Sequence, residues 1–287
     1  MPLASFGLSG VVSAGYRQTS VNGPAGASIA MPIGPGPGID AAGAGFQALA
    51  MNYTDLIRSQ CFIDGMWVAA DSAATFAVDD PATGETIASV PKMGAAETAR
   101  AIAAAGAALP AWRALTAGAR AKLLRRLFDL MIEHQQALGE LLSREQGKPL
   151  AEAVGEIAYS ASFIEWFAEE GKRAYGEVIP TFADNRRVVT LRQPVGVVAA
   201  ITPWNFPSAM IGRKLGPALA AGCTVVLKPA SQTPLSALAL AVLAEQAGIP
   251  KGVFNVITGS AAAIGGELTS NPVSGLWYRR TTAAGRV

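Results

Sequence analysis

The fold class of this chain is decided by the stretch Val195-Gly196-Val197-Val198-Ala199-Ala200-Ile201-Thr202-Pro203-Trp204-Asn205-Phe206-Pro207. A nearly unbroken apolar run ends at Ile201 and predicts a buried strand, and Pro207 suits the first turn of a following helix. The same alternation extends on both sides, with expected strands at 188–191, 195–201, 224–227 and 253–257 and expected helices at 207–221, 234–247 and 261–270. Buried strands that alternate with helices indicate an α/β fold with a parallel sheet flanked by helices.

The part of the chain before this alternation divides into two segments of different composition. Residues 1–50 are rich in Gly, Ala and Pro and have no helical or strand period, so we expect a disordered extension. From Met51 onward we expect one folded domain over 51–287. Its first part should contain strands at 62–68 and 75–78 and helices at about 95–108, 117–146 and 150–175.

Composition excludes several classes of partner. With a net charge of +2 and no run of Lys or Arg, the sequence gives no reason to expect nucleic-acid binding. No apolar stretch reaches the roughly 18 residues of a membrane-spanning helix, so we expect no membrane partner. The two cysteines, Cys61 and Cys223, show neither metal-ligand nor disulfide spacing, and we expect no metal and a reducing, cytoplasmic location.

The loop after the first long strand holds a candidate hydrogen-bond donor. In a parallel sheet, ligands bind beyond the carboxyl ends of the strands. Asn205 stands there between Pro203 and Pro207, which restrict the backbone on either side. Its side-chain amide could donate to a ligand. The alternative is that Asn205 only caps the helix that follows.

The next two loops offer groups suited to a nucleotide. Lys228 ends a buried strand and is followed by Pro229, which places an ammonium group where ribose or phosphate could bind, although a solvated lysine is the alternative. The third loop contains Gly259 and leads to Gly265 near the start of a helix. Small residues there would let backbone N–H groups approach a pyrophosphate.

The three loops together resemble the aldehyde dehydrogenase superfamily, closest to the NAD(P)-dependent succinate-semialdehyde dehydrogenases. The matching segments are Pro203–Pro207, Lys228–Pro234 and Gly259–Gly265, and the resemblance covers residues 56–275. It implies a Rossmann-like cofactor-binding domain over 51–287, in which Asn205 donates to the oxyanion formed from the aldehyde. The implied cofactor-binding residues are Ile201, Thr202, Pro203, Trp204, Asn205, Lys228, Pro229, Ala230, Ser231, Gly259 and Gly265.

Ser231 bears on the choice between NADP and NAD. The resemblance implies that relatives preferring NAD often carry a glutamate at this position, which would repel a 2′-phosphate. A small neutral hydroxyl near Lys228 tolerates that phosphate. We therefore expect NADP as the cofactor, with NAD possible.

Arg213 bears on the substrate. It lies in the run Pro207-Ser208-Ala209-Met210-Ile211-Gly212-Arg213-Lys214, which is similar to the run that carries an arginine in succinate-semialdehyde dehydrogenases. The resemblance implies a short aldehyde with a distal carboxylate, which this arginine would bind. The alternative is a surface arginine on an amphipathic helix.

The resemblance also implies what lies elsewhere in a full-length relative. The nucleophilic cysteine, the general-base glutamate and further oligomerisation strands of these homo-oligomers belong to a catalytic half with no match here. Cys223, at the start of a buried strand, and Cys61 are not expected to replace that nucleophile, and His134 is expected to be structural. We therefore expect a truncated chain, inactive alone. The alternatives are a non-catalytic dinucleotide-binding or subunit-interacting fragment, or a remnant that does not fold stably.

Overall fold

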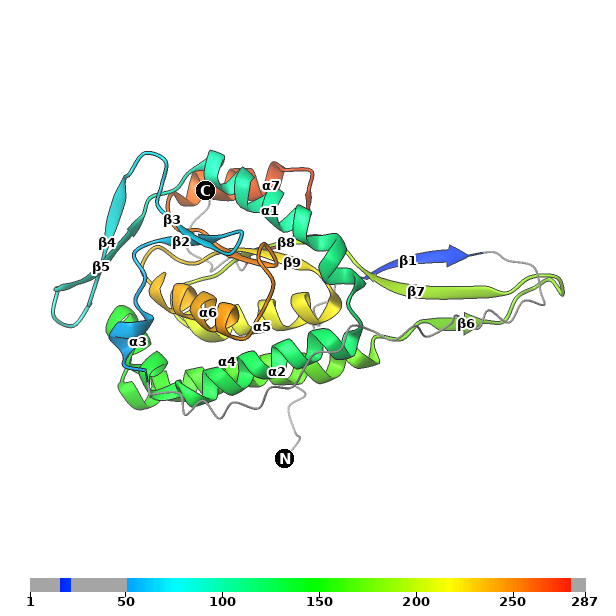
Figure 1. Ribbon diagram of the computed structural model, residues 1–287, viewed down its shortest axis with the longest axis horizontal. Coiled ribbons are helices and arrows are strands. Elements are labelled where there is room, and N and C mark those ends of the chain that lie inside the picture. Colours follow the sequence, from blue (N-terminus) through cyan, green and yellow to red (C-terminus); the bar gives the residue numbers. More distant parts are fainter. Residues whose placement is uncertain (1–15, 22–50, 280–287) are drawn as a thin grey trace, which may run out of the picture.

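A computed structural model describes residues 16–21 and 51–279, and its centre is a six-stranded sheet (Figure 1). The strand order is β11-β8-β9-β10-β2-β3. The strands are β2 Cys61–Ile63, β3 Met66–Val68, β8 Val197–Ile201, β9 Thr224–Lys228, β10 Phe254–Val256 and β11 Ser274–Arg279. The four strands from β11 to β10 are parallel, whereas β2 and β3 pair antiparallel. The predicted α/β sheet is therefore present, but it is mixed rather than wholly parallel.

Helices cover both faces of this sheet, and a further helical layer covers one side. In Figure 1, α1 and α7 lie on one face, α5 and α6 on the other, and α2 and α4 lie beyond α5. The helices are α1 Ala95–Ala114, α2 Ala117–Glu133, α3 Gln135–Gln146, α4 Leu150–Glu170, α5 Pro207–Ala221, α6 Leu235–Gln246 and α7 Ala261–Ser270. Because α5 and α6 lie between the sheet and the outer layer, nearly all of their residues are buried.

Strand β8 shows how the sequence divides the core between the two faces. Val197 and Ala199 belong to the cluster that also contains residues of α1 and α7, while Val198 and Ala200 belong to the cluster shared with α5 and α6. Successive side chains of a strand point to opposite faces, so an unbroken apolar run serves both. This two-sided burial is what the apolar sequence of β8 predicts.

The observed elements correct several predicted boundaries. The expected helix over 117–146 is interrupted at His134, a buried residue with φ −104° and ψ 20° that separates α2 from α3. Helix α1 runs to Ala114, six residues further than expected, and α4 ends at Glu170. The prediction missed β5, β6 and β11. The remaining elements are β4 Thr75–Asp79, β5 Thr86–Pro91, β6 Glu177–Ile179, β7 Val188–Pro194 and the short 3-10 helices Tyr53–Leu56 and Gly171–Arg173.

A separate three-stranded sheet projects from the helical layers (Figure 1). Its order is β1-β7-β6, and β1 is Tyr16–Val21, paired antiparallel with β7. Residues 16–21 were predicted to be part of a disordered extension, and this prediction is wrong for them. The rest of that extension, 1–15 and 22–50, lies outside the described residues.

The strand order reverses once within the parallel part of the sheet. From β8 the chain adds β9 and then β10 on one side, and it then crosses back to place β11 on the other side of β8. In doubly wound sheets, the crevice at the carboxyl ends of the two strands flanking such a reversal is the usual ligand site. The fold therefore points to the end of β8, where Ile201 and the loop after it lie.

Candidate functional site

The carboxyl ends of three parallel strands lie level with one another at this crevice. Ile201, the last residue of β8, stands opposite Lys228 of β9 and opposite Arg279 of β11. The backbone N–H of Thr202 then donates to the carbonyl oxygen of Lys228 at 3.1 Å. This bond holds the start of the 202–206 loop against the end of β9, so the structure brings the first two predicted loops together.

Several side-chain oxygens at these two loops are buried without a hydrogen-bond partner. They are Thr202 Oγ1, Asn205 Oδ1, Ser208 Oγ and Thr233 Oγ1. Most buried polar atoms in proteins are paired with protein groups or water, so these oxygens are available to a ligand or to water at this end of the sheet. Hydroxyl and amide groups are suited to the polar surface of a nucleotide.

Asn205 does not cap the helix that follows it. The residue at the N-cap of α5 is Phe206, and no side-chain hydrogen bond is formed from that position. The backbone N–H groups of Ser208 and Ala209 instead donate to Oε1 of Glu156 at 2.9 and 3.1 Å. The interpretation of Asn205 as a helix cap is thus wrong, and its amide remains available to a ligand.

Lys228 is a buried lysine. Only 5% of the residue is exposed, and its Nζ donates to the carbonyl oxygen of Pro229 at 2.9 Å. Burial lowers the pKa of its ammonium group because the charged form is poorly solvated there. The interpretation of Lys228 as a solvated lysine is therefore wrong. Ala230 and Ser231, which follow Pro229, are half-buried at the mouth of the sheet.

The two glycines of the third loop have different surroundings. Gly259 has a φ of +136°, and a Cβ added there would lie 2.3 Å from the carbonyl oxygen of Met93. Its lack of a side chain is thus required by the main chain beside it. Gly265 lies within α7, and an added Cβ would meet no atom within 4 Å. The first glycine permits packing, whereas the second leaves a bare, open stretch of helix that a ligand could approach.

Arg213 is half-buried at the contact between α4 and α5. Its Nη2 donates to Tyr159 Oη at 3.0 Å, and its guanidinium lies 5.0 Å from the centre of the Phe163 ring. Gly212 beside it allows close approach, since a Cβ there would lie 2.6 Å from the carbonyl oxygen of Ser160. Arg213 is therefore held by two aromatic side chains of α4 rather than free on a helix surface.

The comparisons with known proteins agree with this geometry. A family model described as "Aldehyde dehydrogenase family" matches residues 67–276. The chain belongs to the aldehyde dehydrogenase family.

Named relatives of this aldehyde dehydrogenase chain act on semialdehydes. Glutarate-semialdehyde dehydrogenase of Pseudomonas aeruginosa is 68% identical over 232 residues, which are 80% of this chain and 48% of that protein. Succinate-semialdehyde dehydrogenase (NADP(+)) GabD of Escherichia coli is 62% identical over 239 residues, 83% of this chain and 50% of that protein. The chain spans about half the length of these curated relatives.

The solved structures show the same similarity. A crystal structure described as that of an NADP-dependent enzyme of Escherichia coli is 64% identical, with a TM-score of 0.76. The match covers 77% of this chain and 46% of that one. The resemblance inferred from the three loops is thereby confirmed at the level of family and fold.

Neither cysteine of this aldehyde dehydrogenase chain is suited to attack an aldehyde. Burial raises the pKa of the Cys61 thiol to about 11, and its Sγ lies 3.2 Å from Thr258 Oγ1. Burial also raises the pKa of Cys223, which immediately precedes β9. A reactive cysteine needs a lowered pKa and access to substrate, and both thiols have the opposite environment.

The sequence analysis missed charged residues that support the site. Lys148 falls between the predicted helices 117–146 and 150–175, Glu145 and Glu156 fall within them, and none of the three was predicted as a site residue. The available signal was position: Glu156 falls among Ala153, Ile157 and Ser160 on the buried face of α4. A carboxylate in an apolar stripe indicates a buried partner, here the start of another helix.

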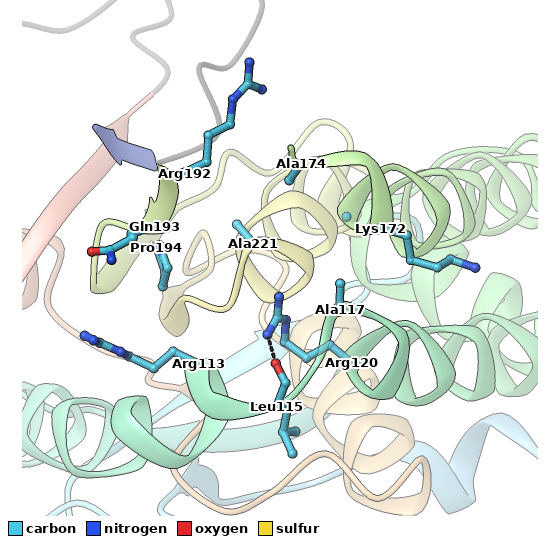
Figure 2. A pocket seen from close by; sticks show the side chains of 11 residues that line it. Arg113, Leu115, Ala117, Arg120, Lys172, Ala174, Arg192, Gln193, Pro194 and Ala221 are labelled. Carbon is cyan, nitrogen blue, oxygen red and sulfur yellow. Dashed lines mark hydrogen bonds between the residues drawn. The ribbon is translucent and has the colours of Figure 1, made fainter. Parts of the chain in front are cut away.

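A cavity of about 360 Å³ lies at the opposite, amino end of the strands (Figure 2). Four of its lining residues are basic: Arg113, Arg120, Lys172 and Arg192. Figure 2 shows the ends of Lys172 and Arg192 directed away from the cavity. The guanidinium of Arg120 donates to the carbonyl oxygens of Leu115 and Ala220. It therefore joins the start of α2 to the end of α5.

Two further observations concern only the described ranges 16–21 and 51–279. Their helices do not combine the length and apolar character that crossing a bilayer requires. Within the same ranges, no three His, Cys, Asp or Glu side chains lie close enough together to hold a metal ion.

Proposed function

We propose that residues 51–287 form a nicotinamide dinucleotide-binding domain, which binds NADP in preference to NAD at the carboxyl ends of β8 and β9. The observation that carries the proposal is the cluster of unpaired buried oxygens around Thr202 and Asn205, beside the buried ammonium of Lys228. Hydroxyl groups and a cation suit ribose and phosphate, and the open backbone at Gly265 suits a pyrophosphate. Ile201, Pro203, Trp204, Pro229, Ala230 and Gly259 would complete the site.

The reaction we infer for an enzyme that contains this domain together with a reactive cysteine is the oxidation of an aldehyde to a carboxylic acid. Because neither Cys61 nor Cys223 is suited to the attack, we expect the chain alone to be inactive. A bound nicotinamide would supply the acceptor for hydride. Asn205 would stabilise the negative charge that develops on the aldehyde oxygen, because its side-chain amide lies beyond the carboxyl end of β8 and makes no hydrogen bond to the described residues. Such a donor is commonly worth a factor of about 10²–10³ in rate.

The substrate we infer is a short aldehyde with a distal carboxylate. Arg213 would bind that carboxylate, and its contacts with Tyr159 and Phe163 would fix the direction of the guanidinium. The names of the relatives support this class and leave two lengths open, the four-carbon succinate semialdehyde and the five-carbon glutarate semialdehyde.

A cofactor titration tests the first part of the proposal. The purified chain should bind NADP at least as tightly as NAD, measured by calorimetry at fixed ionic strength. Ser231→Glu should shift the preference towards NAD, because a carboxylate repels the 2′-phosphate. Gln232→Glu adds the same charge at the exposed neighbouring position and should shift it much less. A preference of the unaltered chain for NAD of about tenfold or more would contradict the proposal.

A comparison of product analogues tests the second part. Succinate and glutarate carry a carboxylate that could bind Arg213, whereas butyramide carries none, so saturation-transfer NMR should show stronger binding of the two diacids. Arg213→Met should remove that advantage. Arg125→Met is the matched control, since Arg125 also lies over a phenyl ring, that of Phe128, but on α2. Equal binding of butyramide and succinate by the unaltered chain would exclude Arg213 as a carboxylate ligand.

A further inference from the structure

We propose that Lys148 and Glu156 are positioning residues for Asn205, a role that rests on the proposed function of Asn205 as the oxyanion donor. Both lie outside the three cofactor loops, Lys148 between α3 and α4 and Glu156 within α4. Both side chains are almost fully buried, with 10% of Lys148 and 1% of Glu156 exposed. Burying two opposite charges is costly because both lose their hydration, so a buried ion pair suggests a role beyond stabilising the fold.

Glu156 fixes the helix that follows Asn205. Its Oε1 accepts hydrogen bonds from the backbone N–H groups of Ser208 and Ala209, in the first turn of α5. These N–H groups have no acceptor within their own helix. A carboxylate at this position also interacts favourably with the positive end of the helix dipole. The start of α5 is therefore tied to α4, three residues after Asn205.

Lys148 connects that carboxylate to Asn205 itself. Its Nζ donates to Oε2 of Glu156 at 2.5 Å and to the backbone carbonyl oxygen of Asn205 at 3.1 Å. The same ammonium group lies 4.2 Å from the centre of the Phe206 ring. One buried cation thus contacts the glutamate that caps α5, the main chain of Asn205 and the side chain of the next residue.

These contacts hold the backbone that carries the Asn205 amide. Within the described residues, the bond from Lys148 is the only hydrogen bond made to Asn205, and its side chain makes none. Because no hydrogen bond holds the side chain, the position of the amide depends on the backbone that carries it. That backbone is held on one side by the bond from Thr202 to Lys228 and on the other by Lys148 and Glu156.

Glu145 provides a natural control for this interpretation. It too is a buried glutamate that caps a helix, since its two oxygens accept from the N–H groups of Leu235 and Ser236 at the start of α6, at 2.7 and 2.8 Å. No described basic residue forms a salt bridge with it, and it makes no hydrogen bond to the loop of Asn205. A change at Glu145 should thus disturb α6 and leave the Asn205 loop in place.

The first experiment tests Lys148 with the full chain labelled with 5-fluorotryptophan. In Lys148→Met/Glu156→Gln both charges are removed, and the Gln carbonyl can still accept from Ser208 and Ala209, so the contacts of the ammonium group with Asn205 and Phe206 are lost while the cap of α5 is kept. We expect the ¹⁹F resonance of Trp204, assigned with Trp204→Phe, to shift or broaden. The resonance of Trp112, which bonds to Leu219 at the far end of α5, should not change.

The second experiment tests Glu156 by hydrogen exchange. In Glu156→Ala the amides of Ser208 and Ala209 should exchange about tenfold faster or more, because bonds to a charged acceptor are lost. Exchange at Leu235 and Ser236 should stay unchanged, and Glu145→Ala should give the reverse pattern. An unchanged Trp204 resonance in the double variant overturns the role of Lys148, and unchanged exchange at Ser208 and Ala209 overturns that of Glu156.

Neither readout needs cofactor, so failure of the proposed function is separable from failure of this inference. If the unaltered chain binds NADP, the double variant should bind it several-fold more weakly, because Trp204 and Asn205 lie in the displaced loop. If the unaltered chain binds no NADP, the proposed function fails, and the spectra and exchange rates still decide whether these two residues position the loop.

Discussion

The helices on the two faces of the sheet begin in different ways. On one face, the first-turn amides of α5 and α6 donate to Glu156 and Glu145, which come from the outer helices α4 and α3. On the other face, α7 is capped by its own N-cap residue, Ser260, whose Oγ accepts from the N–H of Ala263 at 3.3 Å. The loop before α7 is held by main-chain contact between Gly259 and Met93.

The difference follows from how deeply each helix start is buried. Helices α5 and α6 lie between two layers, so their terminal N–H groups cannot reach water and need an acceptor supplied by the next layer. Only Ile264 and Leu268 of α7 are buried, so solvent and one hydroxyl suffice there. The stability of the buried N-terminal ends of α5 and α6 should thus depend on charged residues distant in the sequence. The stability of the exposed N-terminal end of α7 should depend on its own cap residue.

The largest loss in the free energy of unfolding is expected from Lys148→Met. This variant leaves the Glu156 carboxylate buried without its counter-ion, which typically costs about 3–5 kcal/mol in the free energy of unfolding. Urea denaturation followed by circular dichroism at neutral pH measures the loss. Lys172→Met is the control, because the Lys172–Glu169 pair is half-exposed and should contribute less than about 1 kcal/mol.

The double variant Lys148→Met/Glu156→Gln sharpens this prediction. If the loss in Lys148→Met comes from the unpaired charge, neutralising Glu156 should recover most of it, because the pair and its neutral replacement are often similar in stability. A double variant as unstable as the single one would show that the lysine stabilises through its other contacts, with Asn205 and Phe206, and not through the ion pair.

The next effect is a dependence of stability on pH that originates at Glu145. Burial raises its pKa from 4.5 to about 7, although hydrogen bonds from the amides of Ser236 and Leu235 act in the opposite direction. Because the folded protein holds this proton more tightly than the unfolded chain, the stabilisation is complete below pH 4.5 and is lost as pH rises through about 7. The integrated change is about 3 kcal/mol.

Glu145→Gln should remove this contribution, since an amide does not titrate. Unfolding free energies measured between pH 5 and 8 should fall with pH for the unaltered chain and fall less steeply, by up to about 3 kcal/mol over the range, for the variant. Parallel curves for the two proteins would show that Glu145 is ionised in the folded state throughout, with a pKa near its ordinary value.

A smaller loss is expected from Gly259→Ala on the other face. The φ of +136° is unfavourable for alanine, and its Cβ would lie 2.3 Å from the Met93 carbonyl oxygen. We expect a cost of about 1–3 kcal/mol. Gly265→Ala is the matched control, because that Cβ meets no atom and alanine favours a helix by roughly 0.5–1 kcal/mol. Similar losses at both glycines would contradict the difference between them.

The sequence predicted those elements whose ends are marked by residues typical of helix starts and stops. Helix α5 was predicted at its observed bounds because Pro207 marks its start and Gly222 follows its end, and α7 was likewise predicted at its observed bounds of Ala261 and Ser270. Strand β11 was missed because Gly275 interrupts its apolar run and Arg279 ends it. Its pairing with β8 is a long-range contact, yet it creates the reversal of strand order that places the crevice.

The predicted site residues are recognisable from local sequence, whereas the missed ones depend on contacts between distant parts of the chain. Asn205 and Lys228 could be found from the sequence because Lys228 ends a strand and Asn205 lies in the loop after one, and the carboxyl ends of parallel strands meet at one edge of the sheet. Lys148 and Glu156 could not be paired with that loop, because their burial depends on α4 packing against α5, some fifty residues further along the chain. The proposed roles of all four residues remain predictions.

The smallest effect is expected from Ser260→Ala, which removes the local cap of α7. The Ser260 hydroxyl accepts one hydrogen bond, from the N–H of Ala263, and losing an N-cap typically costs about 1 kcal/mol. Thr269→Ala is the control, because that exposed hydroxyl bonds back to Gly265 within the helix and should change stability by less than about 0.5 kcal/mol. Exchange of the Ala263 amide should quicken in Ser260→Ala alone. If Ser260→Ala instead costs as much as Lys148→Met in the same denaturation experiment, α7 depends on its cap as strongly as α5 depends on Glu156, and burial does not explain the difference between the two faces.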